Sequence, residues 1–243
     1  MLFANNKMPT TPPPSYRWYP LVTAVFVTSL IVSNIIAVKL VQIGGLILPA
    51  AVILFPVAYI FGDILTEVYG YARARQAIWI GFFCNLLAVG AFWIAGLLPA
   101  APFWTAGIFD EPDTAQQAYQ AILGFTPRLL LASFIAYLIG EFLNSFVLAK
   151  LKVRTAGRYL WLRTITSTLI GQAADSAVFL TIAFWGILPL AGLQQAILNQ
   201  WLFKVAYEIL ATPLTYLVVN RLKRAEGMDT YDRDTDFSPL RAR

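Results

Sequence analysis

The stretch that decides the fold is Gln76–Leu98, QAIWIGFFCNLLAVGAFWIAGLL, which contains 23 residues and no charged side chain. An α-helix needs about 20 mostly apolar residues to cross the hydrocarbon core of a bilayer. A transmembrane β-strand would instead alternate apolar and polar residues over about 10 positions. The continuous apolar run therefore predicts a membrane-spanning helix.

Five other stretches share this length and apolar character, and the composition of the whole chain agrees with them. Of the 243 residues, 58% are hydrophobic and 13% are charged, whereas a soluble domain is about 25% charged. These values exclude an ordinary cytosolic enzyme and a disordered protein. We expect an all-α integral membrane protein, a six-transmembrane-helix bundle with spans Tyr19–Val41, Leu46–Tyr69, Gln76–Leu98, Pro127–Ala149, Thr164–Leu188 and Leu193–Asn220.

Lys and Arg residues occupy alternate connections of this expected bundle. They lie before the first span and after the second, fourth and sixth, whereas Gln42–Gly45, Pro99–Phe125 and Pro189–Gly192 contain none. Because cytoplasmic loops carry the excess of Lys and Arg, both termini are expected in the cytoplasm. The expected parts are a disordered cytoplasmic arm (1–18), a six-helix transmembrane domain (19–221) and a disordered cytoplasmic tail (222–243).

Several kinds of chemistry are excluded by residues that the sequence lacks. It has no His and one Cys, Cys84, so it has no His ligand or base and no disulfide within the chain. It also has no P-loop, no Gly-rich dinucleotide motif and no cluster of metal-ligating residues. We therefore expect no metal, no cofactor and no catalytic residue, and the chain is not expected to be an enzyme.

Polar residues inside the spans are the candidate functional residues. An ionisable group at the bilayer centre costs about 2.5–3.5 kcal/mol on insertion scales and usually faces the bundle interior or a water-filled cavity. Here such residues recur at spacings of three and four, which places them on one face of each of four helices. Near the helix ends, Glu67, Lys39 and Arg128 are equally consistent with a structural role. The candidate binding residues are Asn34, Tyr59, Asp63, Glu141, Asn144, Gln172, Asp175, Lys204 and Glu208.

Seven of these nine positions, all except Asn34 and Glu208, fall within motifs that resemble the queuosine precursor transporters, a family of vitamin-uptake-like integral membrane proteins. The resemblance covers roughly residues 32–221. It rests on four stretches: F55-P-x-x-Y-x3-D63-x3-E67-V-Y-G70, G140-E-x-x-N144, R163-x3-S-T-x-x-G-Q-x-x-D175-S, and F203-K204 with P213-x-x-Y216. It implies a fold similar to the substrate subunits of energy-coupling vitamin importers. It also implies import of 7-cyano-7-deazaguanine, its aminomethyl derivative or queuine across the inner membrane for tRNA modification.

A deazaguanine substrate suggests roles for the candidate residues. Its N1–H and 2-amino group form an edge that one carboxylate can accept as a bidentate pair. Its O6 atom needs a hydrogen-bond donor, and its flat ring can stack on an aromatic side chain. The aminomethyl derivative is cationic, so its ammonium group needs an anionic partner. The candidates are Asp175 or Asp63 for the edge, Gln172 or Lys204 for O6, Tyr59, Phe179 or Trp201 for the ring, and Glu208 or Glu141 for the ammonium group.

Several alternatives remain open at this stage. The chain could be a carrier coupled to protons through Glu208 or Asp175, or a facilitator. It could also be the substrate-binding subunit of an energised importer for another heterocycle, docking through small residues of the first span. Two other classes of protein are also open: an intramembrane aspartyl-type enzyme that uses Asp63 and Asp175, and a structural protein. The expected partners are a small molecule and the lipid bilayer, without direct contact to nucleic acid, while homo-oligomers and energising partners stay open.

Overall fold

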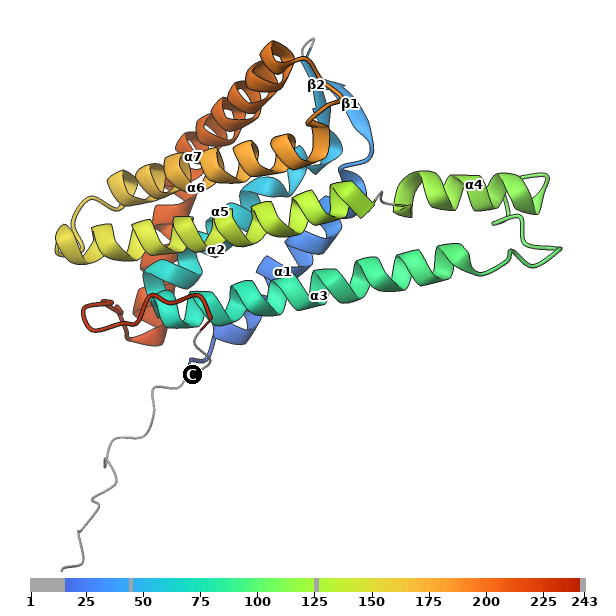
Figure 1. Cartoon of the computed structure of the whole chain (residues 1–243). Coiled ribbons are helices and arrows are strands. Elements are labelled where there is room, and N and C mark those ends of the chain that lie inside the picture. The colour runs from blue at the N-terminus through green and yellow to red at the C-terminus, as the bar shows by residue number, and fades with distance from the viewer. Residues whose placement is uncertain (1–15, 44–45, 125–126, 241–243) are drawn as a thin grey trace, which may run out of the picture.

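The computed structural model describes residues 16–43, 46–124 and 127–240, which form a mostly helical protein (Figure 1). Its elements are α1 (Tyr19–Ile36), β1 (Leu40–Ile43), β2 (Leu46–Pro49), the 3-10 helix η1 (Ala50–Ile53), α2 (Phe55–Tyr69), α3 (Tyr71–Leu97), α4 (Pro112–Leu123), α5 (Pro127–Arg154), α6 (Leu160–Phe184) and α7 (Leu190–Glu226). Residues 1–15, most of the expected N-terminal arm, lie outside the described residues.

The expected membrane-spanning helices are present in most cases. Within the part of the chain that the structure describes, five helical stretches are long and apolar enough to cross a membrane: Tyr19–Ile36, Tyr71–Leu97, Pro112–Arg154 (which includes α5), Leu160–Phe184 and Leu190–Glu226. Their exposed surfaces are apolar, as for Leu87 of α3 (74% exposed) and Leu210 of α7 (78%). Many other large apolar side chains of these helices are also exposed, which fits contact with lipid. The chain is thus a multi-pass membrane protein.

The second expected span, Leu46–Tyr69, is wrong over its first third. Its helix α2 begins only at Phe55 and has 15 residues, or about 22 Å at 1.5 Å per residue. The preceding residues form β2, which pairs antiparallel with β1 in the register Leu40↔Pro49 to Ile43↔Leu46. The sequence between the strands is Gly44-Gly45, a pair typical of tight hairpins. The first span is shortened for the same reason, since its last residues belong to β1.

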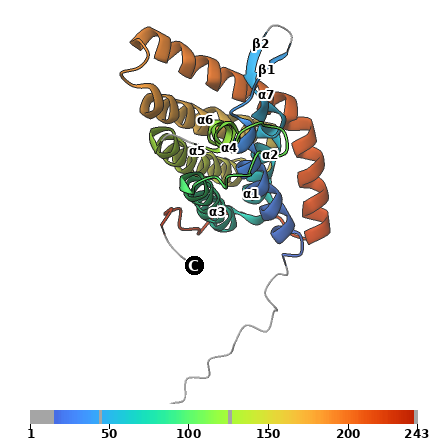
Figure 2. The same cartoon turned by 90° about the vertical axis from the view of Figure 1, so that its right-hand side faces the viewer.

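Two glycines bring α5 and α6 into close contact. A Cβ atom on Gly140 of α5 would lie 2.8 Å from the Asp175 Cβ, and one on Gly171 of α6 would lie 2.8 Å from the Asn144 Cβ. A larger residue at either position would therefore force the two helices apart. Figure 2 shows α3, α5 and α6 nearly end-on, with a bent α7 passing around them. Pro213 within α7 cannot donate a backbone hydrogen bond, which favours such a bend.

The expectation of a disordered tail from residue 222 is also wrong. Helix α7 continues to Glu226, and residues 227–240 pack against the start of α3 (Figure 1). Asp232 is 4% exposed and accepts the Tyr71 backbone N–H with both carboxylate oxygens, at 3.1 and 3.0 Å. Arg75 donates to the backbone carbonyls of Asp236 and Ser238 at 3.1 and 2.7 Å. The tail is held because its polar side chains and carbonyls satisfy groups at this helix end.

Asp232→Ala is expected to lower the free energy of unfolding by about 1 kcal/mol, because it removes the acceptor that caps α3. The freed tail should also be cut faster by a protease. Limited proteolysis and thermal unfolding in detergent measure both effects. Asp234→Ala is the matched control, because this acid is in the same tail but exposed. Equal proteolysis of the two variants would contradict the capping role.

Candidate functional site

Glu67, at the end of α2, is the centre of a buried charged cluster. Its side chain is 0% exposed, and Arg163 of α6 donates to both of its carboxylate oxygens at 2.7 Å. Lys223 of α7 lies 2.5 Å and Lys152 of α5 lies 3.5 Å from Glu67 Oε1. Asp229 of the tail completes the cluster, at 2.5 Å from Lys152 and 2.8 Å from Lys223. Three cations and two carboxylates thus join α2, α5, α6, α7 and the tail.

The sequence interpretation of these cations as loop charges that report topology is incomplete. Lys152 and Arg163 are each 1% exposed, so they serve as buried ion-pair partners. Burial alone would raise the pKa of the Asp229 carboxyl, but the ammonium groups of Lys152 and Lys223 hold this pKa below its ordinary value. The cluster is fully paired, which indicates a structural role for Glu67 rather than contact with a ligand.

Farther along the same helices, four of the predicted site residues form a first polar layer. Lys204 of α7 donates to Asp175 Oδ2 of α6 in a direct ion pair and is also hydrogen-bonded to Tyr59 of α2. Glu141 of α5 interacts electrostatically with both members of this ion pair. The side chains of Lys204 and Asp175 are 12% and 19% exposed. The first polar layer (Tyr59, Glu141, Asp175 and Lys204) is therefore partly accessible.

A second polar layer lies about one helical turn closer to Glu67. Asn144 of α5 donates to Asp63 Oδ1 of α2 at 2.8 Å, and Asp63 interacts electrostatically with Glu208 of α7. Gln172 of α6 is at the same level, three residues before Asp175. This second polar layer (Asp63, Asn144, Gln172 and Glu208) is enclosed, since its members are 1–6% exposed. Each of the four helices thus contributes one residue to each layer.

The structure brings eight of the nine predicted site residues together in these two layers. The exception is Asn34 of α1, which donates to Asn85 Oδ1 of α3 at 3.0 Å and so joins two other helices. Of the predicted aromatic neighbours, Trp201 donates its indole N–H to the Leu169 backbone carbonyl at 2.9 Å, across the α6–α7 contact. Among the described residues, no group of three Asp, Glu or Cys side chains could hold a metal ion.

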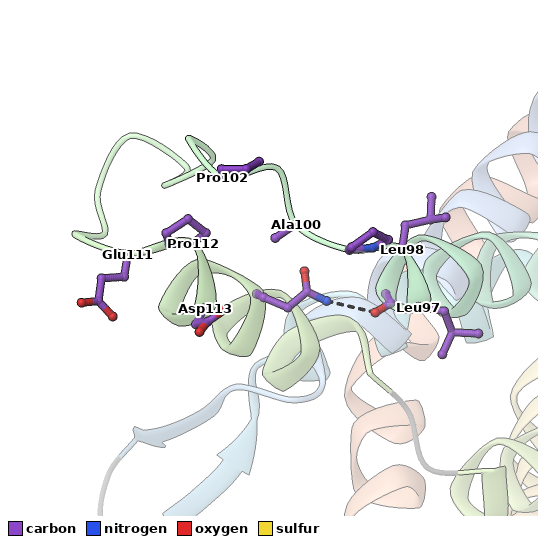
Figure 3. Close-up of a pocket in the computed structure, with 10 residues that line it drawn as sticks. Leu97, Leu98, Ala100, Pro102, Glu111, Pro112 and Asp113 are labelled. Carbon is purple, nitrogen blue, oxygen red and sulfur yellow. Dashed lines mark hydrogen bonds between the residues drawn. The ribbon is translucent and has the colours of Figure 1, made fainter.

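A separate hollow of about 650 Å³ lies between the end of α3 and the start of α4 (Figure 3). Its wall includes Leu98, Glu111 and Asp113, and Gln116 donates to the Gly96 carbonyl there at 2.9 Å. None of the nine predicted site residues lines it. The two polar layers, and not this hollow, gather the charged groups inside the membrane-spanning helices.

A known family matches the region that carries these layers, and three known proteins are similar to the chain. The family described as "Putative vitamin uptake transporter" matches residues 49–218. A Bacillus subtilis (strain 168) protein named "Probable queuosine precursor transporter" is 30% identical over 187 residues, 76% of this chain and 77% of that protein. An Escherichia coli (strain K12) protein named "Queuosine precursor transporter" is 28% identical over 134 residues, 54% of this chain and 52% of that protein. A Haemophilus influenzae protein named "Probable queuosine precursor transporter" is 25% identical over 134 residues, 54% and 49% of the two chains. No solved structure matches the chain.

Proposed function

The chain belongs to the family described as "Putative vitamin uptake transporter", and from this premise we propose that it imports a queuosine precursor across the bacterial inner membrane. This family is one of transporters and not of enzymes. The observation that carries the proposal is a charged, partly accessible layer between four helices of a chain whose relatives are named for this cargo. Such residues within membrane-spanning helices typically mark a substrate pathway.

We propose that the chain crosses the membrane six times, through the five long helices and the shorter α2, and that both termini lie in the cytoplasm. Glu226, at the end of α7, accepts the backbone N–H groups of Arg17 and Trp18 at 3.1 and 2.7 Å. The start of α1 and the end of α7 therefore meet at one end of the bundle, which requires an even number of crossings. Five long spans and α2 give six. The count agrees with the substrate subunits of energy-coupling importers, which the motifs suggested.

We assign recognition of the base to the first polar layer. A carboxylate of Asp175 or Glu141 accepts N1–H and the 2-amino group, and Lys204 donates to O6. Tyr59 lies beside this donor and packs against the ring. The layer has two carboxylates and one ammonium group, so it also accommodates the positive charge of the aminomethyl derivative. Asn34, bonded to Asn85, we assign to packing of α1 against α3.

Expression of this chain in cells that cannot make queuosine precursors is expected to restore queuosine in tRNA. Each of the three deazaguanines is supplied separately at low nanomolar concentration, and modified tRNA is measured. The compound that restores modification identifies the cargo. An empty vector is the control for passive entry. If no compound restores modification although the protein is present in the membrane, the proposed import by this chain alone is refuted.

A further inference from the structure

The second polar layer has more hydrogen-bond acceptors than donors. The Asn144 amide supplies the hydrogen bond to Asp63 Oδ1. Glu208 is 1% exposed, and neither of its carboxylate oxygens has a partner among the residues that the structure describes. Within the layer, the other buried oxygens that have no partner among the described residues are Asp63 Oδ2, Asn144 Oδ1 and Gln172 Oε1. Asn144 and Gln172 are 6% and 5% exposed, so these atoms lie away from bulk water. The side chains of the layer therefore hold fewer polar hydrogens than acceptor oxygens.

The charges around the layer make two ionised carboxylates unfavourable. The ionisable groups that act on Asp63 are Glu208 of α7, Glu141 of α5 and Glu67 of α2, and all three are acids. Helix α6 presents Gln172 and Asp175 on this side, and Asp175 is paired with Lys204.

The remaining buried cations cannot compensate. Lys152, Arg163 and Lys223 are bonded within the Glu67 cluster. Arg75, which is 5% exposed, is bonded to backbone carbonyls of the tail. An uncompensated buried ion costs several kcal/mol. Two buried carboxyl groups that interact electrostatically under these conditions keep one proton between them.

We propose that Asp63 and Glu208 form a proton-carrying pair that couples uptake of the substrate to entry of a proton. The inference rests on the proposed transport function. The proton binds one carboxylate oxygen, and the resulting O–H donates to the other carboxylate, which adds a polar hydrogen to the layer. On release to water the two carboxylates repel each other, and α2 and α7 are pushed apart at this level.

The position of the pair explains how substrate and proton are linked. Asp63 follows Tyr59 by one turn on α2, and Glu208 follows Lys204 by one turn on α7. A substrate that fixes Tyr59 and Lys204 therefore also fixes the spacing of the two carboxyl groups. Because that spacing determines whether the pair can share a proton, occupancy of the first polar layer controls protonation of the second.

The proposal is tested with the full chain in liposomes that enclose a fluorescent pH indicator. The probe is 7-cyano-7-deazaguanine, which is neutral, so any proton movement belongs to the protein. Addition of the probe is expected to acidify the lumen. With one proton per substrate, accumulation should rise about tenfold per unit of inward pH gradient. A pH gradient without effect, or accumulation driven by a sodium gradient instead, would overturn the proposal.

Glu208→Gln is the variant that separates proton coupling from binding, because glutamine resembles the protonated acid. It should lose the acidification and the response to the pH gradient, but keep exchange of labelled for unlabelled probe across the membrane. Asp63→Asn should behave in the same way and serves if the first variant does not fold. Asp113→Asn, in exposed α4, is the control that keeps both activities. Gradient-driven uptake by both pair variants contradicts the inference, whereas wild-type protein without probe exchange contradicts the transport function itself.

Discussion

Asp175→Asn is expected to reduce uptake about 100-fold while the protein stays folded in the membrane. A carboxylate that accepts two N–H groups of a buried ligand contributes about 3 kcal/mol, which corresponds to roughly 100-fold in affinity. The fold should survive because Lys204 keeps Tyr59 as a partner and Glu141 as a nearby anion. Uptake of labelled deazaguanine and thermal unfolding in detergent measure the two quantities separately.

A double variant distinguishes recognition of the substrate from simple helix packing. If the Asp175–Lys204 ion pair only joins α6 and α7, each single neutral variant leaves one charge unpaired and loses stability. Asp175→Asn combined with Lys204→Met removes both charges and should recover stability. In our proposal the double variant is stable but takes up no substrate, because both partners of the base are missing. Normal uptake by a stable double variant would exclude the two residues from the binding site.

The sequence predicted the long helices well because each is one apolar run of sufficient length. It predicted the second span less well, since an apolar run such as Leu46–Ile53 has the same composition in a strand and in a helix. Pairing with Leu40–Ile43, a tertiary contact, decides between them. The shortened α2 is the result, and the hairpin at its start had no clear signal in hydropathy.

The candidate site followed from spacing, whereas the partners within it did not. Intervals of four residues on α2 and α7 and of three on α5 and α6 were enough to place one residue of each helix in each polar layer. Which acid pairs with Lys204 depends on how the helices are rotated, and this is fixed by contacts such as Gly140 against Asp175. Asn34 was placed in the site because it is a polar residue inside a span. Its pairing with Asn85 could not be predicted, since Asn85 lies 51 residues away on a helix with no other deep polar group.

Glu67→Gln is expected to lower the free energy of unfolding by about 3–5 kcal/mol, because it leaves buried cations without their central carboxylate. Asp229 would then be the remaining anion of the cluster for Lys152 and Lys223, and Arg163 would lose both of its 2.7 Å hydrogen bonds to Glu67. The expected result is a large fall in the unfolding temperature in detergent and less protein in the membrane.

Lys223→Gln is the matched comparison, since it removes a cation from the same cluster but one whose side chain is 18% exposed. Glu67 keeps Arg163 and Lys152 in that variant, so the loss of stability should be smaller than for Glu67→Gln. Arg163→Gln should resemble Glu67→Gln, because it removes the bidentate partner of a carboxylate that is 0% exposed.

Where a Glu67 variant remains folded, its uptake per molecule should be close to normal, because the cluster is fully paired and at least one helical turn from both polar layers. A folded Glu67→Gln protein without uptake would instead place this carboxylate on the substrate or proton path.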